Sequence, residues 1–499
     1  MSKYLNKLKE IRDDKANKLL IIGLGVENRQ FLKWVLVELN FPPKQIILAD
    51  KVKVEFDFAN VNDFETYLGH DYLDSLQLQN IKMVIKSPGL WSLNSELVAF
   101  RTAHGQNIIL SSLTFFLEKY REQIVGVTGT KGKTTTCSLI HHLLKDDREI
   151  YYCGNTTGIS PYKYWNNESA YFVIELSSFQ LQDLSFARIS PKFSVITNLF
   201  IDHLDQHGTK EEYWKAKDAI FEFQTLDDYF VAHDQIWDNL REREMDAETD
   251  FGLIKYTSKY PNDQFMLTKV LVDDVKSNFK TKLLGEHNLQ NLSLALVICS
   301  LVLLSKTLKD RKPNLALVLE KLIKNQNIYQ QRLDQFQAIA GRLELVRTID
   351  KNGVKVNFYN DNAATEPDAV IAAIQALTQK TDQKLYLIAG GKLKQGNFLD
   401  LANLIRQKIA SKAIFKYTFF SQVGYELDRI DKENGNAGFE ALPKMRDFFT
   451  QSLDIDLFTS KDDQIKAINI LFSPGGSSFD EFTNYLERQK QYLEWVESF

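Results

Sequence analysis

The sequence of 499 residues predicts an α/β protein of three domains. Short apolar runs that end at glycine or at a polar residue alternate with helical runs in the first and last thirds of the chain. This alternation favours parallel sheets with crossover helices. A glycine-rich segment followed by a helix in the middle third is typical of a phosphate-binding loop. At roughly 150 residues per domain there is room for about three domains, which we place at 1–111, 112–338 and 339–499.

The first domain begins with a buried strand in KLLIIGLG (18–25), followed by the helical run RQFLKWVLVEL (29–39). Further strands are predicted in KQIILAD (44–50) and IKMVIKSPG (81–89). Ligands of such sheets bind at the carboxyl ends of the strands, where GLGVEN stands without the third glycine of the dinucleotide-binding pattern. Asp50 ends the second strand. It could accept a ribose hydroxyl or cap the backbone, and spacing alone leaves both open.

The segment VGVTGTKGKTTTCSLIHHLLK (125–145) carries the clearest chemistry of the chain. Gly129 and Gly132 allow backbone N–H groups to face phosphate oxygens, Lys133 adds a positive charge, and Thr134 adds a hydroxyl that can bind Mg²⁺. The helix that follows presents its N-terminus to the anion. These features predict a nucleotide phosphate site.

Acidic and imidazole groups follow the next two predicted strands. Glu175 ends YFVIE and could bind Mg²⁺ or cap the strand end. The loop IDHLDQHG contains His203 and Asp205, and its two imidazoles and two carboxylates lie within six residues. That density exceeds what a solvated loop needs. The next helix carries Lys215 and Lys217, and a lysine on such a helix is usually only solvated.

The third domain contains three predicted strands, in VNFYNDNAAT (356–365), KLYLIAGG (384–391) and AINILFSPGG (467–476). Each strand stops at small or polar residues, as expected for a second open α/β sheet. The functional edge of this sheet is expected in the loops that follow the strands.

The composition argues against several classes of function. A net charge of −4 gives no excess of positive charge for nucleic acid. The three cysteines are far apart and form no metal-type spacing, which fits a reducing cytosol. The charged N-terminus lacks the apolar segment of a signal peptide, and no uninterrupted run of 18 apolar residues predicts a membrane span. We expect a cytoplasmic monomer that binds small molecules and neither nucleic acid nor membrane.

Taken together, these segments resemble the Mur ligases, the ATP-dependent amide-forming enzymes of peptidoglycan precursor synthesis. GVTGTKGKTTT is similar to their G-x-x-G-T-x-G-K-[ST] motif. The general P-loop pattern would have its first glycine at position 127, which is Val127, whereas the Mur ligase motif has it one place earlier, at Gly126. ELSSFQL, TNLFIDHLDQHGTKEEYWKAKDAIF and GEHNLQN resemble the central domain of the D-glutamate-adding branch, and GRLE, GGKLKQGNF and FSPGGSSFDEF its C-terminal domain. The resemblance implies a Rossmann-like N-terminal domain for a UDP-sugar, a central P-loop ATPase domain with a mostly parallel sheet, and a Rossmann-like C-terminal domain for an amino acid.

The resemblance also implies a role for each matching residue. The catalytic groups would be Lys133, Glu175, His203 and Lys217. ATP would contact Gly129, Thr130, Lys131, Gly132, Lys133, Thr134, Thr135, Asn288, Asn291, Arg342 and Asp361. The UDP-sugar would contact Gly25, Val26, Glu27, Asp50, Ser87, Asn155, Ser177 and His203, and the amino acid Thr365, Lys394, Ser478 and Tyr485. Two Mg²⁺ would be held by Thr134, Glu175, His203 and Lys217, with Lys217 carbamylated, a carboxylate made from lysine and CO₂.

Two segments depart from the family pattern. The family's Gly-Asn-x-Gly is one residue longer here, at 154–158 on the sugar side. The family's Asp-Ser-Lys-Ala-Thr-Asn reads Asp-Asn-Ala-Ala-Thr-Glu at 361–366, so that Ala363 stands in place of a lysine. The charge of Lys392 could substitute for that lysine, or Lys392 could be a solvated loop residue.

The implied reaction adds D-glutamate to UDP-N-acetylmuramoyl-L-alanine through an acyl phosphate, with ATP as phosphoryl donor. One alternative is a relative that adds L-glutamate to the same nucleotide. Another is a different superfamily ligase such as a folylpolyglutamate synthase, against which ELSSFQL and the glycine-rich N-terminal segment count. A P-loop NTPase switch without ligase activity is the alternative from another class. It would hydrolyse ATP without the UDP-sugar.

Overall fold

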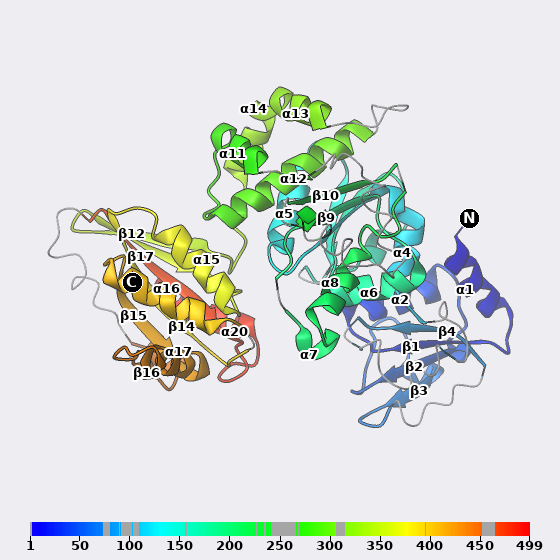
Figure 1. Ribbon diagram of the computed structural model, residues 1–499. Coiled ribbons are helices and arrows are strands. Elements are labelled where there is room, and N and C mark those ends of the chain that lie inside the picture. The colour runs from blue at the N-terminus through cyan, green and yellow to red at the C-terminus, as the bar shows by residue number, and fades with distance from the viewer. Residues whose placement is uncertain are drawn as a thin grey trace, which may run out of the picture. The chain divides into compact units, whose positions relative to one another are not determined.

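The fold is given by a computed structural model (Figure 1), which describes residues 2–72, 80–88, 90, 102, 109–154, 157–200, 202–225, 227–233, 236–238, 240, 266–267, 269–305, 315–394, 396–451 and 465–499. The chain forms two compact units. The first comprises Met1–Phe279 with Gln290–Arg332, and the second comprises Lys280–Leu289 with Leu333–Phe499.

Sheet A in the first unit has five parallel strands in the order β3-β2-β1-β4-β5. The strands are β1 Lys18–Ile22, β2 Ile46–Asp50, β3 Glu65–Leu68, β4 Ile81–Lys86 and β5 Ile109–Ser111, with helices α1 Lys3–Asp13 and α2 Val26–Val37. This order is that of the first five strands of a Rossmann sheet, whose ligands bind where the order reverses, between β1 and β4.

Sheet B in the same unit has six parallel strands in the order β11-β10-β9-β6-β8-β7. The strands are β6 Ile124–Thr128, β7 Ile150–Gly154, β8 Tyr171–Glu175, β9 Phe193–Ile196, β10 Tyr229–His233 and β11 Met266–Leu267. The helices are α4 Leu113–Tyr120, α5 Lys133–Leu144, α6 Ser178–Ala187, α7 Leu204–His207, α8 Lys210–Asp218, α11 Lys269–Asn278, α12 Glu286–Ser305, α13 Leu315–Lys324 and α14 Gln326–Gln335. The first turn of α12 and the last residues of α14 belong to the second unit.

Sheets A and B share one hydrophobic core. The ring centroids of Phe31 in α2 and Phe115 in α4 lie 5.3 Å apart, and those of Trp34 and Trp165 lie 4.4 Å apart. Lys86 at the end of β4 donates to Asp183 in α6 at 2.7 Å, and both side chains are 2% exposed. Removing one partner of such a buried pair would leave an uncompensated charge. The two sheets therefore depend on the same contacts for stability.

Sheet C in the second unit has the strand order β12-β13-β17-β14-β15-β16, in which only β12 is antiparallel to its neighbour. The strands are β12 Glu344–Lys351, β13 Val354–Asn360, β14 Gln383–Gly390, β15 Ile414–Phe420, β16 Ala441–Leu442 and β17 Ala467–Gly475. The helices are α15 Pro367–Leu377, α16 Phe398–Ala410, α17 Ser421–Glu433, α18 Met445–Phe448 and α20 Tyr485–Glu497. The predicted α/β class is confirmed, with one largely or wholly parallel sheet in each predicted range, while the boundaries at 111 and 338 stay a proposal.

Helix α12 is long and apolar enough to cross a membrane by length and composition alone. Its sequence has no uninterrupted run of 18 apolar residues, because polar residues such as Asn291, Ser293 and Ser300 interrupt it. Within the protein, 72% of its apolar window is buried. Burial of that extent is typical of a core helix.

Candidate active site

The predicted phosphate loop connects β6 to α5 in sheet B. It begins at Gly129, with φ 145°, and ends at Gly132, with φ 82°, both values that favour glycine. A Cβ on Gly129 would lie 1.9 Å from Oγ1 of Thr197, and a Cβ on Gly132 would lie 2.4 Å from Oδ1 of Asn291. The two glycines are therefore required by the fold as well as by room for a phosphate.

Thr197 and Asn198, which directly follow β9, hold the loop in place. These two residues were given no role by the sequence analysis. The backbone N–H of Lys131 donates to Oδ1 of Asn198 at 2.8 Å, and the N–H of Thr130 donates to the Asn198 carbonyl at 3.0 Å. Nδ2 of Asn198 and the hydroxyl of Thr197 both donate to the Lys131 carbonyl. The dipeptide Thr-Asn directly after a buried strand was the available signal.

Two lysines meet at one carbonyl oxygen of this loop. Nζ of Lys133 donates to the Gly129 and Thr130 carbonyls at 3.0 and 3.1 Å, and Nζ of Lys217 donates to the Gly129 carbonyl at 3.0 Å. Lys217 is only 2% exposed. Burial lowers the pKa of its amine well below the usual value, and the positive charges of Lys133 and Lys131 lower it further. Lys217 is therefore not the solvated lysine that its helix alone would suggest.

Glu175 lies at the end of β8, next to the phosphate loop, and is buried. Its Oε2 accepts hydrogen bonds from Oγ1 of Thr134 at 3.1 Å and from the hydroxyl of Tyr152 at 2.9 Å. A carboxylate and a hydroxyl at a helix N-terminus are hard oxygen donors that suit Mg²⁺ together with nucleotide phosphates. Among the described residues no cluster of three His, Cys, Asp or Glu side chains forms a cation site. Mg²⁺ usually binds through one or two carboxylates together with phosphate oxygens and water.

The two histidines of the polar loop have different surroundings. His203, in a left-handed conformation with φ 54°, has a half-exposed side chain whose Nε2 lies 3.8 Å from Oδ2 of Asp202. Asp202 is also 3.9 Å from Nζ of Lys131, which brings His203 near the phosphate loop. His207 is buried, with Nε2 3.0 Å from Oγ of Ser178. The side chain of Asp205 lies outside the described residues.

Four of the residues predicted to bind the UDP-sugar lie at the carboxyl ends of the neighbouring strands β2, β1 and β4 of sheet A. A Cβ on Gly23 would lie 2.6 Å from Cβ of Ser87, so the ends of β1 and β4 meet there. Asp50 accepts from the backbone N–H groups of Leu24 and Val52, which is the capping role. Gly25 begins α2 without a side-chain cap and is exposed together with Val26.

Glu27 and Ser177 already have protein partners. The Glu27 carboxylate accepts from Oγ of Ser112 at 2.9 Å and from Nε2 of Gln180 at 3.1 Å, and burial raises its pKa. The Ser177 hydroxyl caps α6 by accepting from the N–H of Gln180 at 3.2 Å. The predicted sugar contact Asn155 lies outside the described residues.

Asn291 and Asn288, both predicted to meet adenine, are engaged within the protein. Oδ1 of Asn291 accepts from the hydroxyl of Thr136 at 3.4 Å, behind the phosphate loop. Nδ2 of Asn288, in the second unit, donates to the Leu284 carbonyl at 2.7 Å. Contact of either residue with the base stays a prediction.

In the second unit, four of the remaining predicted residues follow the carboxyl ends of the neighbouring strands β13, β17 and β14, while Arg342 precedes β12 and Tyr485 begins α20. Asp361 directly follows β13. Its carboxylate accepts from the Leu343 N–H at 3.0 Å and from the Ser473 hydroxyl at 2.7 Å. Burial raises its pKa to about 7. The residues predicted for the amino acid are half-buried Thr365 after β13, exposed Lys394 after β14, buried Ser478 after β17, and half-exposed Tyr485 at the start of α20.

One buried arginine, which the sequence analysis missed, connects these loops. Arg488 in α20 is 0% exposed. Its guanidinium donates to Oδ1 and the carbonyl of Asn362 at 2.7 and 3.1 Å and to the Gly476 carbonyl at 2.9 Å. Asn362 in turn donates to the Tyr485 carbonyl at 2.8 Å. Lys392 is exposed and pairs through its backbone with Ser477, as a solvated loop residue would.

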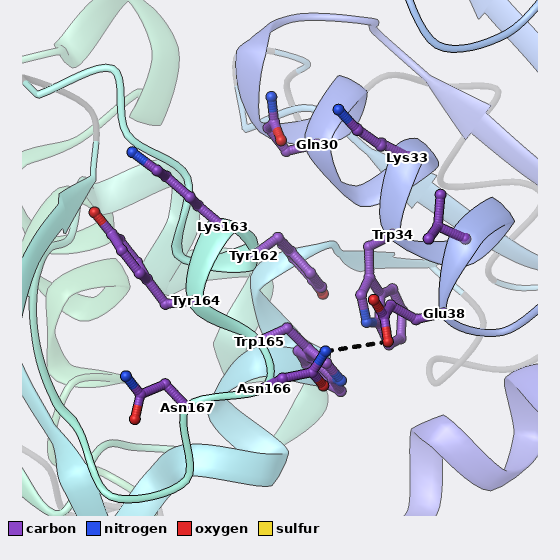
Figure 2. Close-up of a pocket in the computed structure, with 11 residues that line it drawn as sticks. Gln30, Lys33, Trp34, Glu38, Tyr162, Lys163, Tyr164, Trp165, Asn166 and Asn167 are labelled. Atoms are coloured by element: carbon purple, nitrogen blue, oxygen red, sulfur yellow. Dashed lines mark hydrogen bonds between the residues drawn. The ribbon is translucent and has the colours of Figure 1, made fainter.

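In the first unit, a pocket of about 480 Å³ lies between α2 and the segment that begins with the 3₁₀ turn η5, Pro161–Tyr164. Figure 2 shows Gln30 and Lys33 of α2 on one side, Lys163 and Tyr164 on the other, and the hydrogen bond of 3.2 Å from Asn166 to Glu38. None of the lining residues is among those predicted for a substrate.

Comparison with known proteins points to the Mur ligases. Residues 127–299 match the model of the Mur ligase middle domain. Proteins named UDP-N-acetylmuramoylalanine--D-glutamate ligase are similar over nearly the whole chain. That of Leptospira interrogans is 27% identical, covering 97% of each chain, and that of Caldanaerobacter subterraneus is 29% identical, covering 97% of this chain and 98% of the relative. The chain therefore contains a Mur ligase middle domain and is similar to these ligases over nearly its full length.

The Mur ligase relatives include solved structures. The UDP-N-acetylmuramate-alanine ligase of Thermotoga maritima is 16% identical, with a TM-score of 0.49, covering 96% of this chain and 99% of its own. MurF ligase of Thermotoga maritima in complex with ADP is 14% identical, with a TM-score of 0.49, covering 97% of each chain. The matching middle domain and the full-length similarity indicate that the chain is an ATP-dependent, ADP-forming amide ligase.

Proposed function

We propose that this Mur ligase adds D-glutamate to UDP-N-acetylmuramoyl-L-alanine in peptidoglycan precursor synthesis, as a cytoplasmic monomer. The observation that carries the proposal is the full-length similarity to proteins named for that reaction, at 27–29% identity. The geometry agrees with it. A phosphate loop bears two converging lysines in the first unit, and a polar edge suited to a dicarboxylate lies in the second.

The chemistry begins with activation of a carboxylate. An oxygen of the L-alanine carboxylate attacks the γ-phosphorus of ATP, the bond to the β–γ bridging oxygen breaks, and ADP leaves. The glutamate amine then attacks the acyl carbon, the bond to the phosphate oxygen breaks, and inorganic phosphate and a proton leave. The first transfer needs mainly positioning and neutralisation of charge, which Lys133 and the loop N–H groups are placed to supply.

Mg²⁺ fits the donors beside this loop. Thr134 and Glu175 would hold one ion, and His203 with a modified Lys217 a second, as hard oxygen and imidazole donors. Bound there, Mg²⁺ would neutralise phosphate oxygens during the transfer.

The burial of Lys217 and the positive charges beside it support its carbamylation. Two positively charged amines sharing the Gly129 carbonyl would repel each other. If the neutral Lys217 nitrogen attacks the carbon of CO₂, an N–C bond forms, a C=O electron pair moves to oxygen, and one proton leaves to solvent. The resulting carboxylate would attract Lys133 and present oxygen ligands to a cation.

The amino acid is best matched by glutamate. Its two carboxylates need cationic or hydroxyl donors, and Lys394, Thr365 and Ser478 supply both kinds at one edge of sheet C. The altered segment 361–366 is where a relative that adds L-glutamate would be expected to differ. A folylpolyglutamate synthase or an NTPase switch would share the phosphate loop but would require no UDP-sugar.

Parallel assays with pure D- and L-glutamate, UDP-N-acetylmuramoyl-L-alanine and ATP should yield product faster with the D enantiomer. A hydrogen bond to a charged group contributes about 1.5–3 kcal/mol, so losing one should slow the L enantiomer by about tenfold or more. Product mass and ADP release are the measurements. Faster turnover with L-glutamate would reverse the assigned enantiomer, and ADP release independent of the UDP-sugar would refute the ligase assignment.

A further inference from the structure

Tyr152 brings a second strand to the carboxylate proposed to bind magnesium. It lies in β7, the edge strand of sheet B, and pairs in parallel with Val173 of β8. Val173 and Glu175 are two residues apart on one strand and so face the same side of the sheet. Two residues of a strand span roughly 6.6 Å, a distance that a tyrosine side chain can cover. The Tyr152 hydroxyl accordingly donates to Oε2 of Glu175 at 2.9 Å.

The space between the two strands is shaped for this contact. Gly154 is the residue paired with Glu175, and a Cβ there would lie 2.9 Å from the Glu175 carbonyl and 3.2 Å from its Cβ. Since no side chain can stand at 154, Tyr152 is the residue of β7 that reaches the carboxylate.

The two donors lie on the same carboxylate oxygen. Oε2 accepts from Tyr152 and from Thr134 at 3.1 Å, which fixes the rotation of the carboxylate about its last bond. Fixing that rotation directs Oε1 as well. Residues that hydrogen-bond to a metal ligand orient that ligand toward the cation, and their loss typically lowers metal affinity or activity by about 10–100-fold.

We propose that Tyr152 is a positioning residue that orients the Glu175 carboxylate for magnesium through its hydroxyl. The inference rests on the proposed function, because it takes Glu175 as a magnesium ligand. It assigns Tyr152 a role that neither the phosphate-loop motif nor the strand-end position of Glu175 indicates.

Tyr151 offers a matched control. It is the preceding residue of β7, and its hydroxyl also donates to a carboxylate, Oε1 of Glu149 at 2.7 Å, away from the phosphate loop. Its ring stacks on Tyr164 with centroids 3.7 Å apart. Tyr151→Phe therefore removes the same group from the same strand without touching Glu175.

The test measures Mn²⁺ binding to the full chain in the presence of saturating ADP, by electron paramagnetic resonance of free Mn²⁺. Tyr152→Phe should weaken Mn²⁺ binding by about tenfold or more, while ADP affinity without metal stays within twofold. Tyr151→Phe should leave both affinities within twofold of the unaltered protein. A Tyr152→Phe variant that binds Mn²⁺ within twofold of the unaltered protein overturns the proposal.

A second variant separates the hydroxyl from the ring. If the ring alone positions Glu175 by packing, Tyr152→Leu will weaken Mn²⁺ binding and Tyr152→Phe will not, which also overturns the proposal. An unaltered chain that binds no Mn²⁺ with ADP overturns the metal site and this inference together. Failure of the glutamate assay while the Mn²⁺ results hold would overturn only the assigned substrate.

Discussion

Lys133→Ala should lower the rate of ATP-dependent ligation by on the order of 10²–10³, by analogy with the loss of one donor that stabilises transition-state charge. The Lys133 amine lies at the end of the phosphate loop and donates to the Gly129 and Thr130 carbonyls. The backbone N–H groups that we expect to face the phosphates belong to the same loop. The measurement is kcat from phosphate release at saturating substrates, together with product mass.

Lys145→Ala is the control for this variant, because Lys145 is an exposed lysine at the opposite end of the same helix. Surface substitutions usually change the stability of a protein little. Lys145→Ala should therefore retain the activity of the unaltered enzyme within about twofold. A Lys133→Ala variant within threefold of the unaltered enzyme would remove this loop from the reaction.

Lys217→Ala should abolish most activity, and a short-chain carboxylate such as acetate should restore part of it. The variant leaves a small space at a buried position beside the Gly129 carbonyl, into which a free carboxylate can bring the oxygens that the carbamate would have supplied. Losing a residue that hydrogen-bonds to a metal ligand typically lowers activity by about 10–100-fold. Lys217 is proposed as a ligand itself, so we expect the activity of Lys217→Ala to fall by at least roughly 100-fold.

Rescue should rise with acetate concentration at constant ionic strength and should be absent with chloride. Lys215→Ala, an exposed lysine two residues earlier on α8, should need no rescue. The intact protein should also gain the mass of one CO₂ at Lys217 when mapped under conditions that preserve carbamates. Full activity of Lys217→Ala without added carboxylate would exclude the modification.

The phosphate loop could be predicted from the sequence because its signals are local. Glycines, a lysine and a threonine at fixed spacing before a helix determine the conformation of a short segment almost by themselves. Three adjacent inner strands of each sheet, β2-β1-β4, β9-β6-β8 and β13-β17-β14, were predicted for a related reason, since a buried parallel strand is a short apolar run bounded by turn residues. The strands toward the sheet edges were not predicted. Asp50 stayed open between two roles, because only the structure brings the Leu24 and Val52 amides to its carboxylate.

The partners of the loop could not be predicted, because they depend on the order of strands within a sheet. Asn198 follows β9, which pairs with β6 although β7 and β8 stand between them in the sequence. Tyr152 reaches the predicted Glu175 from the edge strand β7. Nothing in the sequence was a reason to expect different surroundings for His203 and His207, yet the His203 imidazole is half-exposed and the His207 imidazole, one helical turn later, is buried. Arg488 gave no signal at all, since an arginine in an amphipathic helix is ordinarily solvated.

The core shared by sheets A and B has a consequence for synthesis of the chain. Phe31 and Trp34 need the rings of Phe115 and Trp165, which are translated later, and Lys86 needs the carboxylate of Asp183. Domains usually fold in the order in which they leave the ribosome, but here the first sheet emerges with an aromatic surface that nothing yet covers. Translation has to pass α6 before either sheet is stable, so the first third of this enzyme depends on the second for its folding.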